Sequence, residues 1–220
     1  MIRRPPRSTQ GVSSAASDVY KRQCLASRAS ENPRKGNHDD PAGGENLSAL
    51  DLLATCNLVN YFGKHTLSGG GTGKIKIKPV LMQKGRTRVA LYGLGYIRDA
   101  RLHQMFSVKG NVEWARPENT EATALTSWFN MMLIHQNRVS HTPKNAISER
   151  YLPSWLDLVV WGHEHECLVE PTEYGDFMVS QLGSSVVTSL IEGEAKQKQV
   201  MILTCLNMSM MYIDCDKRGM

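Results

Sequence analysis

The sequence lacks a long hydrophobic run, a paired-cysteine motif and an even spread of charge. No stretch of about 18 apolar residues occurs in the chain, so no membrane-spanning helix and no membrane partner are expected. The N-terminus has arginines but no apolar core segment, which excludes a secretory signal peptide. The five cysteines are far apart and form no CxxC pair, a usage typical of reduced thiols in an intracellular protein.

The formal net charge of +5 belongs to one end of the chain. Residues 1–36 carry +6, which leaves −1 for the remaining 184 residues, so the charge does not indicate a DNA-binding face on the folded part. Residues 1–36 also lack hydrophobic periodicity and are predicted to be disordered. Their opening resembles the conceptual translation of a sequencing adapter, so they are interpreted as a non-native segment, with a natural disordered arm as the alternative.

Hydrophobic periodicity predicts a mixed chain of strands and short helices. Asn46 is the predicted cap of a helix that ends near Cys56, with Leu47, Leu50 and Leu53 on one face. Further helices are predicted at 98–107 and about 147–152. Strands are predicted at about 58–62, 75–83, 88–94, 127–136, 159–161, 167–170, 176–181, 185–190 and 199–206, and 200–213 as two β segments around a turn. Their continuous apolar runs indicate sheets buried on both faces, hence an α/β (α+β) fold with a layered β-sandwich flanked by helices.

Histidine and asparagine gather at three points where a strand or a loop ends. These are GNHDD with Asn37 and His38, LIHQN with His135, and WGHEHE with His163 and His165. In layered α/β proteins the carboxyl edge of the sheet is where ligands bind. Imidazole nitrogens and amide oxygens suit zinc, manganese or iron. Each motif alone is typical of a polar turn, a structural histidine or a solvated loop, but Asn37, His135, His163 and His165 together favour a metal site.

These residues carry a resemblance to a known family. The order GNHD, a histidine at a strand end and then GHxH resembles the calcineurin-like metallophosphoesterases. LVNYFGK, WFNMMLIHQNR, DLVVWGHEHEC and SQLGSSVVTSL resemble the double-strand-break repair nucleases of the eukaryotic MRN complex, which are related to bacterial SbcD. The resemblance covers Gly36 to about Val200. It implies that residues 37–206 are the C-terminal part of a nuclease domain of metallophosphoesterase type, incomplete at its N-terminus, with 207–220 as a divergent tail.

The resemblance also implies which residues bind metal. Two manganese ions are expected in the intact family site, where they clamp the attacking and leaving oxygens of a phosphodiester. By matching motif, Asn37, His135 and His163 would bind one ion and His165 the other.

His38 would act on the leaving side of the phosphodiester, and Asp39 is a hypothetical orienting partner for it. The family's Asp-x-His and Gly-Asp motifs, expected upstream of GNHD, do not occur in residues 1–35. The four matching ligands are all neutral, and burying uncompensated metal charge is costly. The sequence therefore predicts at most one weakly bound metal and a chain that is inactive by itself.

The partners that follow from the resemblance are DNA, an SMC-like ATPase and a nibrin-type regulator, in the nucleus. Two alternatives stay open. One is another calcineurin-like phosphoesterase, such as a protein phosphatase. The other is a non-catalytic fragment that forms a homodimer through the helix at 46–56, with Leu50 and Leu53 in the interface, although this helix is equally expected to pack on its own sheet.

Overall fold

A computed structural model describes residues 47–58, 60–65, 73–118, 128–138, 145–206 and 210–216. They divide into two compact units between Phe62 and Gly63, and each unit is described by itself. The segment 1–36 and three predicted site residues, Asn37, His38 and Asp39, lie outside the described residues. The strands and few helices of the described part confirm the α/β class.

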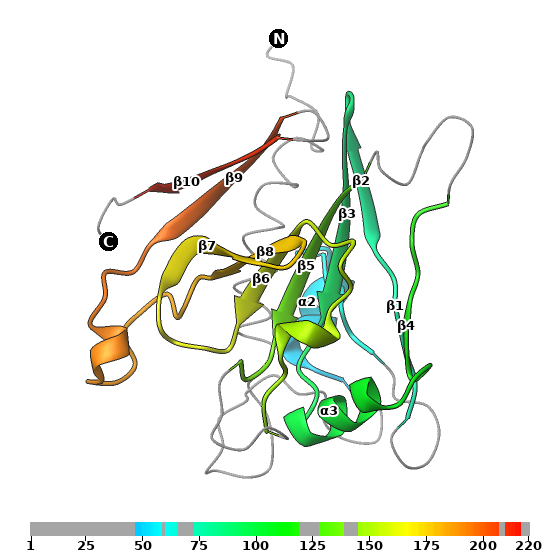
Figure 1. Cartoon of the computed structure of the whole chain (residues 1–220), viewed down its shortest axis with the longest axis horizontal. Helices are drawn as coiled ribbons and strands as arrows, with labels where there is room; N and C mark the ends of the chain where they lie inside the picture. The colour runs from blue at the N-terminus through cyan, green and yellow to red at the C-terminus, as the bar shows by residue number, and fades with distance from the viewer. Residues whose placement is uncertain are drawn as a thin grey trace. The chain divides into compact units, whose positions relative to one another are not determined.

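The second unit is built on a six-stranded sheet of order β2-β3-β5-β6-β8-β7 (Figure 1). The four central strands are parallel, and an antiparallel strand closes each edge. The carboxyl ends of β3, β5 and β6 therefore meet at one end of the sheet, near α3 and at the bottom of Figure 1. The bounds are β2 Val80–Lys84, β3 Thr87–Leu94, β5 Phe129–His135, β6 Leu158–Gly162, β7 Leu168–Tyr174 and β8 Phe177–Gln181.

Two small sheets accompany the large one. β1 (Ile75–Ile77) pairs in parallel with β4 (Val112–Trp114). β9 (Val200–Leu206) and β10 (Met210–Asp216) form an antiparallel hairpin, which confirms the two β segments predicted around a turn.

Cys56 and Cys167 are free thiols. Within the described part, no helix has the length and apolarity needed to span a membrane.

The central strands are buried on both faces, as their continuous apolar runs predict. On one face Tyr92, Met132 and Val159 are opposite one another in register and fully buried. On the other face Leu133 and Val160 are paired and 1% exposed. Alternate residues of a strand point to opposite faces, so a strand buried on both has no polar positions in its middle.

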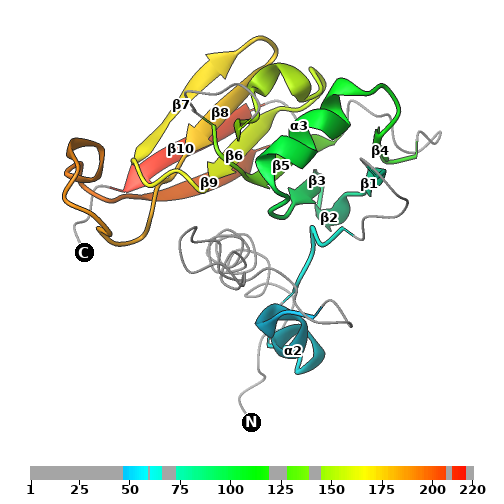
Figure 2. The same ribbon diagram turned by 90° about the horizontal axis from the view of Figure 1, so that it is seen from below.

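The helix α3 (Asp99–Ser107) closes the first of these faces. Its Leu102 and Met105, three residues apart, are both 0% exposed and belong to the main core cluster. Seen from below, α3 lies across the ends of β3 and β5 (Figure 2). The described residues of the unit also include the 3-10 turns η3 (Glu149–Tyr151) and η4 (Glu192–Glu194).

The first unit contains α2 (Ala49–Thr55), and its N-cap is Ser48 rather than the predicted Asn46. Ser48 forms a capping box, in which Asp51 accepts hydrogen bonds from the Ser48 backbone N–H at 2.7 Å and hydroxyl at 2.8 Å. This reciprocal pairing satisfies two helix-end groups at once.

The strand predicted at 58–62 is wrong for the described residues of that range. Asn57 has φ of 55°, and the N–H of Leu58 donates to the carbonyl of Leu53 at 3.0 Å. This is the Schellman arrangement that ends a helix, and it uses the backbone groups that a strand would pair.

Two further predicted strands need correction. The range 75–83 is divided into β1 and β2 by Lys78 and Pro79, since proline has no N–H to donate to a ladder. The range 185–190 contains no strand. There the N–H of Thr188 donates to a side chain, the carboxylate of Glu194, at 2.7 Å. A backbone group paired in this way is not available to a sheet.

The packing of α3 gives a stability prediction. Leu102→Ala is expected to lower the free energy of unfolding by about 2–5 kcal/mol, because it leaves a cavity in place of a fully buried side chain. Gln104→Ala, on the exposed side of the same helix, should change it by no more than about 0.5 kcal/mol. Urea denaturation followed by circular dichroism measures both. Equal effects of the two substitutions would contradict this packing.

Candidate metal centre

Two predicted ligands meet at the carboxyl end of the sheet. His135 is the last residue of β5, and the parallel register places it beside Gly162, the last residue of β6. His163 is the next residue along the chain. Its Nδ1 lies 3.3 Å from Nε2 of His135, and the two rings are almost perpendicular, at 80°.

The backbone at His163 is in an unusual conformation. Its φ is 82°, a region that residues other than glycine rarely occupy and that is associated with functional sites. The ring of Tyr96, from the loop after β3, stacks on the His163 ring at 6.2 Å and 26°. The strained turn and this stacking together aim His163 at His135.

Both histidines are held in the neutral form. His135 is 3% exposed, and burial, reinforced by His163 and His165, lowers its pKa to about 3. Burial is also the main cause that lowers the pKa of His163. Neutral imidazole is the form that binds metal, because one ring nitrogen keeps its lone pair.

The pair has the spacing of neighbouring ligands. Two nitrogens that bind one ion tetrahedrally at about 2.0–2.1 Å lie about 3.3–3.4 Å apart. The 3.3 Å between Nδ1 of His163 and Nε2 of His135 matches this distance. The Nδ1 of His135 is also buried without a hydrogen-bond partner in the described part of the chain. Two histidines alone do not complete a site, and no group of three His, Cys, Asp or Glu that could hold a metal occurs among the described residues.

His165 is placed differently, on the surface. Its side chain is 50% exposed, and its Nδ1 lies 2.6 Å from the Thr188 hydroxyl and 3.5 Å from a carboxylate oxygen of Glu194. It influences the pair through its charge, since it lowers the pKa of both His135 and His163.

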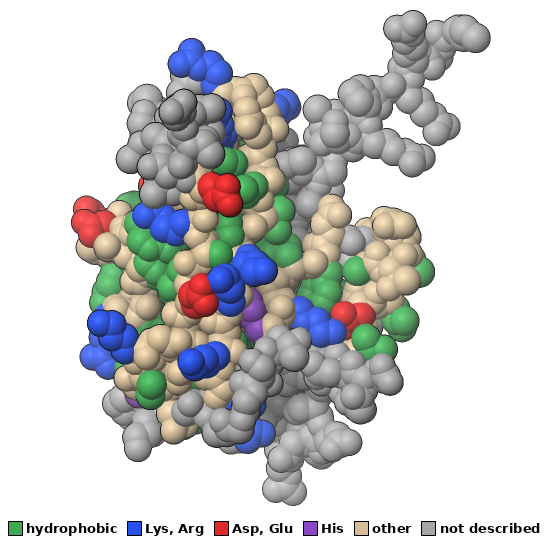
Figure 3. Space-filling view, turned by 90° about the vertical axis from the view of Figure 1, so that its right-hand side faces the viewer, with side chains coloured by type: hydrophobic (Ala, Val, Ile, Leu, Met, Phe, Trp, Pro, Cys, Tyr) green, Lys and Arg blue, Asp and Glu red, His purple; other side chains and the backbone are tan. Residues whose placement is uncertain are grey.

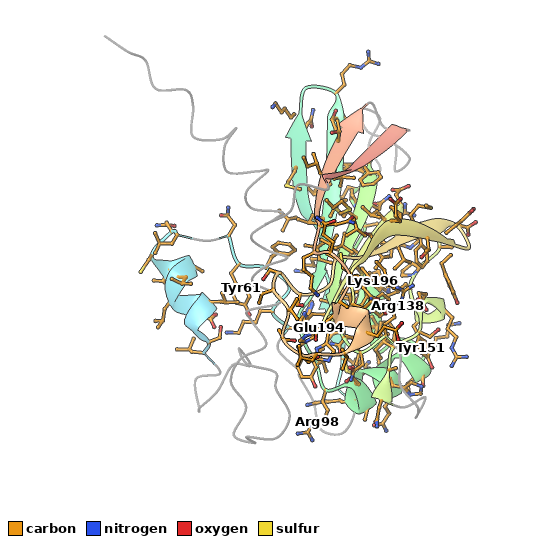
Figure 4. The ribbon with its side chains drawn as sticks, turned by 90° about the vertical axis from the view of Figure 1, so that its left-hand side faces the viewer. Tyr61, Arg98, Arg138, Tyr151, Glu194 and Lys196 are labelled. Carbon is orange, nitrogen blue, oxygen red and sulfur yellow. The ribbon has the colours of Figure 1, made fainter. Side chains whose placement is uncertain are left out.

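Arg138 ties together the loops that carry the histidines (labelled in Figure 4). Its N–H donates to Glu164, between His163 and His165, at 2.7 Å. Its guanidinium donates to Glu149 at 2.7 Å and to Gln181 of β8 at 3.1 Å, and lies over the Trp161 ring. The ion pair with Glu149 is less than a fifth exposed on either side.

A second anchor holds the loop after β5. The side chain and the N–H of Asn137 donate to Asp99, at 2.8 and 3.2 Å. Burial raises the pKa of Asp99 to about 6, and the charge of Glu164 adds to this, while the bonds from Asn137 oppose it. Asp99 is therefore partly protonated just below neutral pH.

Gly183 closes the packing behind His165. Its φ is 70°, and an added Cβ would lie 2.7 Å from the carbonyl oxygen of His165 and 2.9 Å from the backbone nitrogen of Cys167. Only glycine fits this close approach of two backbones. The GSSVVTSL motif thus begins at a contact with the WGHEHE loop.

Several of these residues were not predicted as part of the site. Arg138 lies within the HQNR motif and Thr188 within GSSVVTSL. The motifs therefore mark both residues as part of the resemblance but do not indicate what either residue does. Tyr96 lies within VALYGLGYI, a string that also resembles the family. Glu194 has no signal in the sequence, because its importance depends on contacts with residues far along the chain.

The fold and the paired histidines define the class, a protein with a mixed, largely parallel sheet and candidate metal ligands at the carboxyl edge of that sheet. Comparison with known proteins agrees. The calcineurin-like phosphoesterase family matches residues 33–167, and the chain belongs to that family.

Individual relatives are more specific. The chain is 59% identical over 170 residues to the double-strand break repair protein MRE11 of Arabidopsis thaliana, covering 76% of this chain and 24% of that protein. Identity to the proteins of the same name is 57% in Oryza sativa subsp. indica, with the same coverage, and 51% in Homo sapiens, over 76% of this chain and 23% of that protein. The chain thus spans about a quarter of the length of these relatives.

The pKa of Asp99 gives a pH prediction. Between the ordinary pKa of 3.8 and about 6, the folded chain binds more protons at this group than the unfolded chain, so its contribution to stability falls as pH rises. From pH 4 to pH 7 this loss is up to about 3 kcal/mol, since each tenfold change in proton affinity is about 1.4 kcal/mol. Asp99→Asn removes the dependence, so its stability relative to wild type should improve over that range.

Urea midpoints at several pH values measure this difference. Asp176→Asn, an exposed carboxylate in the turn between β7 and β8, is the matched control. A stability difference between Asp99→Asn and wild type that stays constant with pH would show that Asp99 is not held in this way.

Proposed function

We propose that this chain contributes to the catalytic domain of a metal-dependent DNA nuclease that acts in double-strand break repair. The observation that carries the proposal is the neutral pair His135 and His163, with 3.3 Å between ring nitrogens at the carboxyl edge of the sheet. The family supplies phosphoester hydrolysis as the reaction class. The relatives' name, double-strand break repair protein, supports DNA as the substrate.

In this proposal Asn37, His135 and His163 hold one manganese ion, and His165 holds part of a second site. Bound metal supplies positive charge to the oxygens of the phosphodiester under attack. The protein's contribution is orientation. The stacking on Tyr96 and the strained turn at His163 fix one ring, while burial fixes the other and excludes water from it.

His38 is proposed to act on the leaving oxygen, with Asp39 as its orienting partner. Both are adjacent to Asn37 in the GNHDD motif, so a metal held by Asn37 would bring the phosphodiester to them. This assignment rests on the motif.

On the described residues of the face in Figure 3, charge does not indicate a path for DNA. On the face shown in Figure 3, Lys and Arg side chains are scattered among acidic and apolar ones rather than gathered in one patch. This agrees with the near-zero charge of residues 37–220. An SMC-like ATPase, a nibrin-type regulator and a nuclear location are proposed with the repair role, in which such partners would help to hold DNA.

Metal addition and removal test the nuclease proposal. The chain alone is expected to bind Mn²⁺ weakly and not to degrade duplex DNA ends, because its candidate ligands are all neutral. A fusion that places the family's Asp-x-His and Gly-Asp motifs ahead of Gly36 should degrade DNA with Mn²⁺ and lose activity in EDTA. In the fusion, His163→Asn should reduce the rate by more than about a hundredfold. Loss of a residue that only hydrogen-bonds to a metal ligand typically reduces activity about 10–100-fold, so the larger effect would indicate a direct ligand.

His103→Gln, a substitution of a histidine on α3, is the control and should retain the rate. Parallel assays with p-nitrophenyl phosphate separate the alternatives. A folded fusion that hydrolyses this ester but not DNA would point to another calcineurin-like phosphoesterase. Cleavage of DNA by the unfused chain at a comparable rate would refute the predicted inactivity.

Exposed leucines on α2 and just before it favour a second function, homodimerisation. Leu52 is 66% exposed, Leu53 38% and Leu47 50%, whereas Leu50 is 4% exposed. Because Leu50 is already covered within one chain, Leu53 and Leu52 are better candidates for an interface than Leu50.

Light scattering after size exclusion measures the mass of the particle. If α2 mediates a dimer, wild type elutes as a dimer and Leu53→Glu as a monomer, because a buried unpaired carboxylate opposes association. Asn60→Glu, an exposed site beyond the helix, adds the same charge and should leave the dimer intact. A monomeric wild-type chain would rule out this role.

A further inference from the structure

A buried carboxylate lies behind His165. Glu194, the last residue of η4, has a side chain that is only 2% exposed. It accepts hydrogen bonds from the Thr188 N–H at 2.7 Å and from the Ser189 hydroxyl at 2.7 Å. Both bonds bring a hydrogen to the carboxyl oxygens, and an ionised carboxylate has no hydrogen of its own to donate, so Glu194 acts here only as an acceptor.

The Thr188 hydroxyl links this carboxylate to the histidine. It lies 2.9 and 3.0 Å from the two oxygens of Glu194 and 2.6 Å from Nδ1 of His165. A hydroxyl has one hydrogen, and the carboxylate can only accept, so that hydrogen is directed to Glu194. Thr188 Oγ1 must then accept from His165, which places the imidazole proton on Nδ1 and leaves the lone pair on Nε2.

The backbone of the same residue is fixed by the same segment. The carbonyl of His165 accepts from the N–H of Ser184 at 3.2 Å and from Nζ of Lys198 at 2.8 Å. Lys198 also donates to the Ser184 hydroxyl at 3.0 Å. Residues 183–198 therefore hold both the main chain and the ring of His165, although that ring is half exposed.

We propose that Glu194, acting through Thr188, is a positioning residue that sets the tautomer of His165 and presents its Nε2 as the ligand nitrogen. A hydrogen bond to the far nitrogen of a metal-binding histidine is a common means of fixing its tautomer and orientation. The ligand part of this inference rests on the proposed metal site. The tautomer itself is a property of the chain without metal.

Nitrogen-15 NMR of the whole chain tests the tautomer directly. Two-bond nitrogen–carbon-bound-proton correlations at pH 8 show which ring nitrogen is protonated, and His165→Gln identifies the His165 signals. Wild type is expected to favour the Nδ1–H form about ten- to hundredfold, the range of a charge-assisted hydrogen bond. Glu194→Gln should reduce this preference at least about tenfold, because its amide can donate to Thr188 and reverse the relay.

Matched variants separate the relay from general loop damage. Glu192→Gln removes an exposed carboxylate from the same 3-10 turn and should leave the tautomer unchanged. Thr188→Val should abolish the preference and Thr188→Ser should retain it, because only serine keeps the hydroxyl. A wild-type proton on Nε2, or a preference that survives both Thr188→Val and Glu194→Gln, would overturn the inference.

Mn²⁺ added to the same samples tests the ligand role independently. Selective paramagnetic broadening of the His165 signals, weakened in Thr188→Val and retained in Thr188→Ser, supports Nε2 as a ligand nitrogen. A fixed Nδ1–H tautomer with no selective broadening upholds the relay and overturns the assignment of His165 to a metal. The two parts of the inference therefore fail separately.

Discussion

The contacts of Arg138 join the loops on which the candidate site depends. Arg138, in the loop after β5, binds Glu149 of η3, Gln181 of β8 and Glu164, which lies between His163 and His165. The guanidinium suits this task, because its donors are fixed in one plane and its charge does not titrate. Loss of one partner from such a half-buried cluster leaves charge without compensation, which is far more costly than loss of a surface ion pair. The loops after three neighbouring strands are thereby held as one piece.

The histidines at the ends of these strands are oriented by two different physical means. His135 and His163 are fixed by packing, through burial, ring stacking and a strained backbone, and their facing nitrogens have few protein partners. His165 is exposed, so packing cannot fix it, and a chain of hydrogen bonds from Glu194 does so instead. In the proposed metal site, the pair of buried rings and the exposed ring held by hydrogen bonds would serve different ligand positions.

The central strands were predictable because burial on both faces leaves a continuous apolar run, as in β5 and β6. The histidines at their ends were predictable for the same reason, since a polar residue directly after such a run must lie at the sheet edge. The failures have local causes. Residues 185–190 have apolar composition, yet Gly183 turns the chain and Glu194 takes the backbone N–H that a strand would use. The cap at Ser48 depends on a reciprocal bond with Asp51 that competes with the simpler signal at Asn46.

The acidic residues near the histidines have structural partners, and this bears on the charge of the site. Glu164 accepts from Arg138, Glu166 pairs with Lys196, and Glu194 is enclosed by the segment that holds His165. Each carboxylate is therefore engaged in holding a loop, while the two facing histidines are neutral. Two divalent ions need negative charge close by, because burying uncompensated charge is strongly unfavourable. A competent two-metal site would require carboxylates beyond those of the described residues, and this requirement links the geometry of the pair to the Asp-x-His and Gly-Asp motifs of the family.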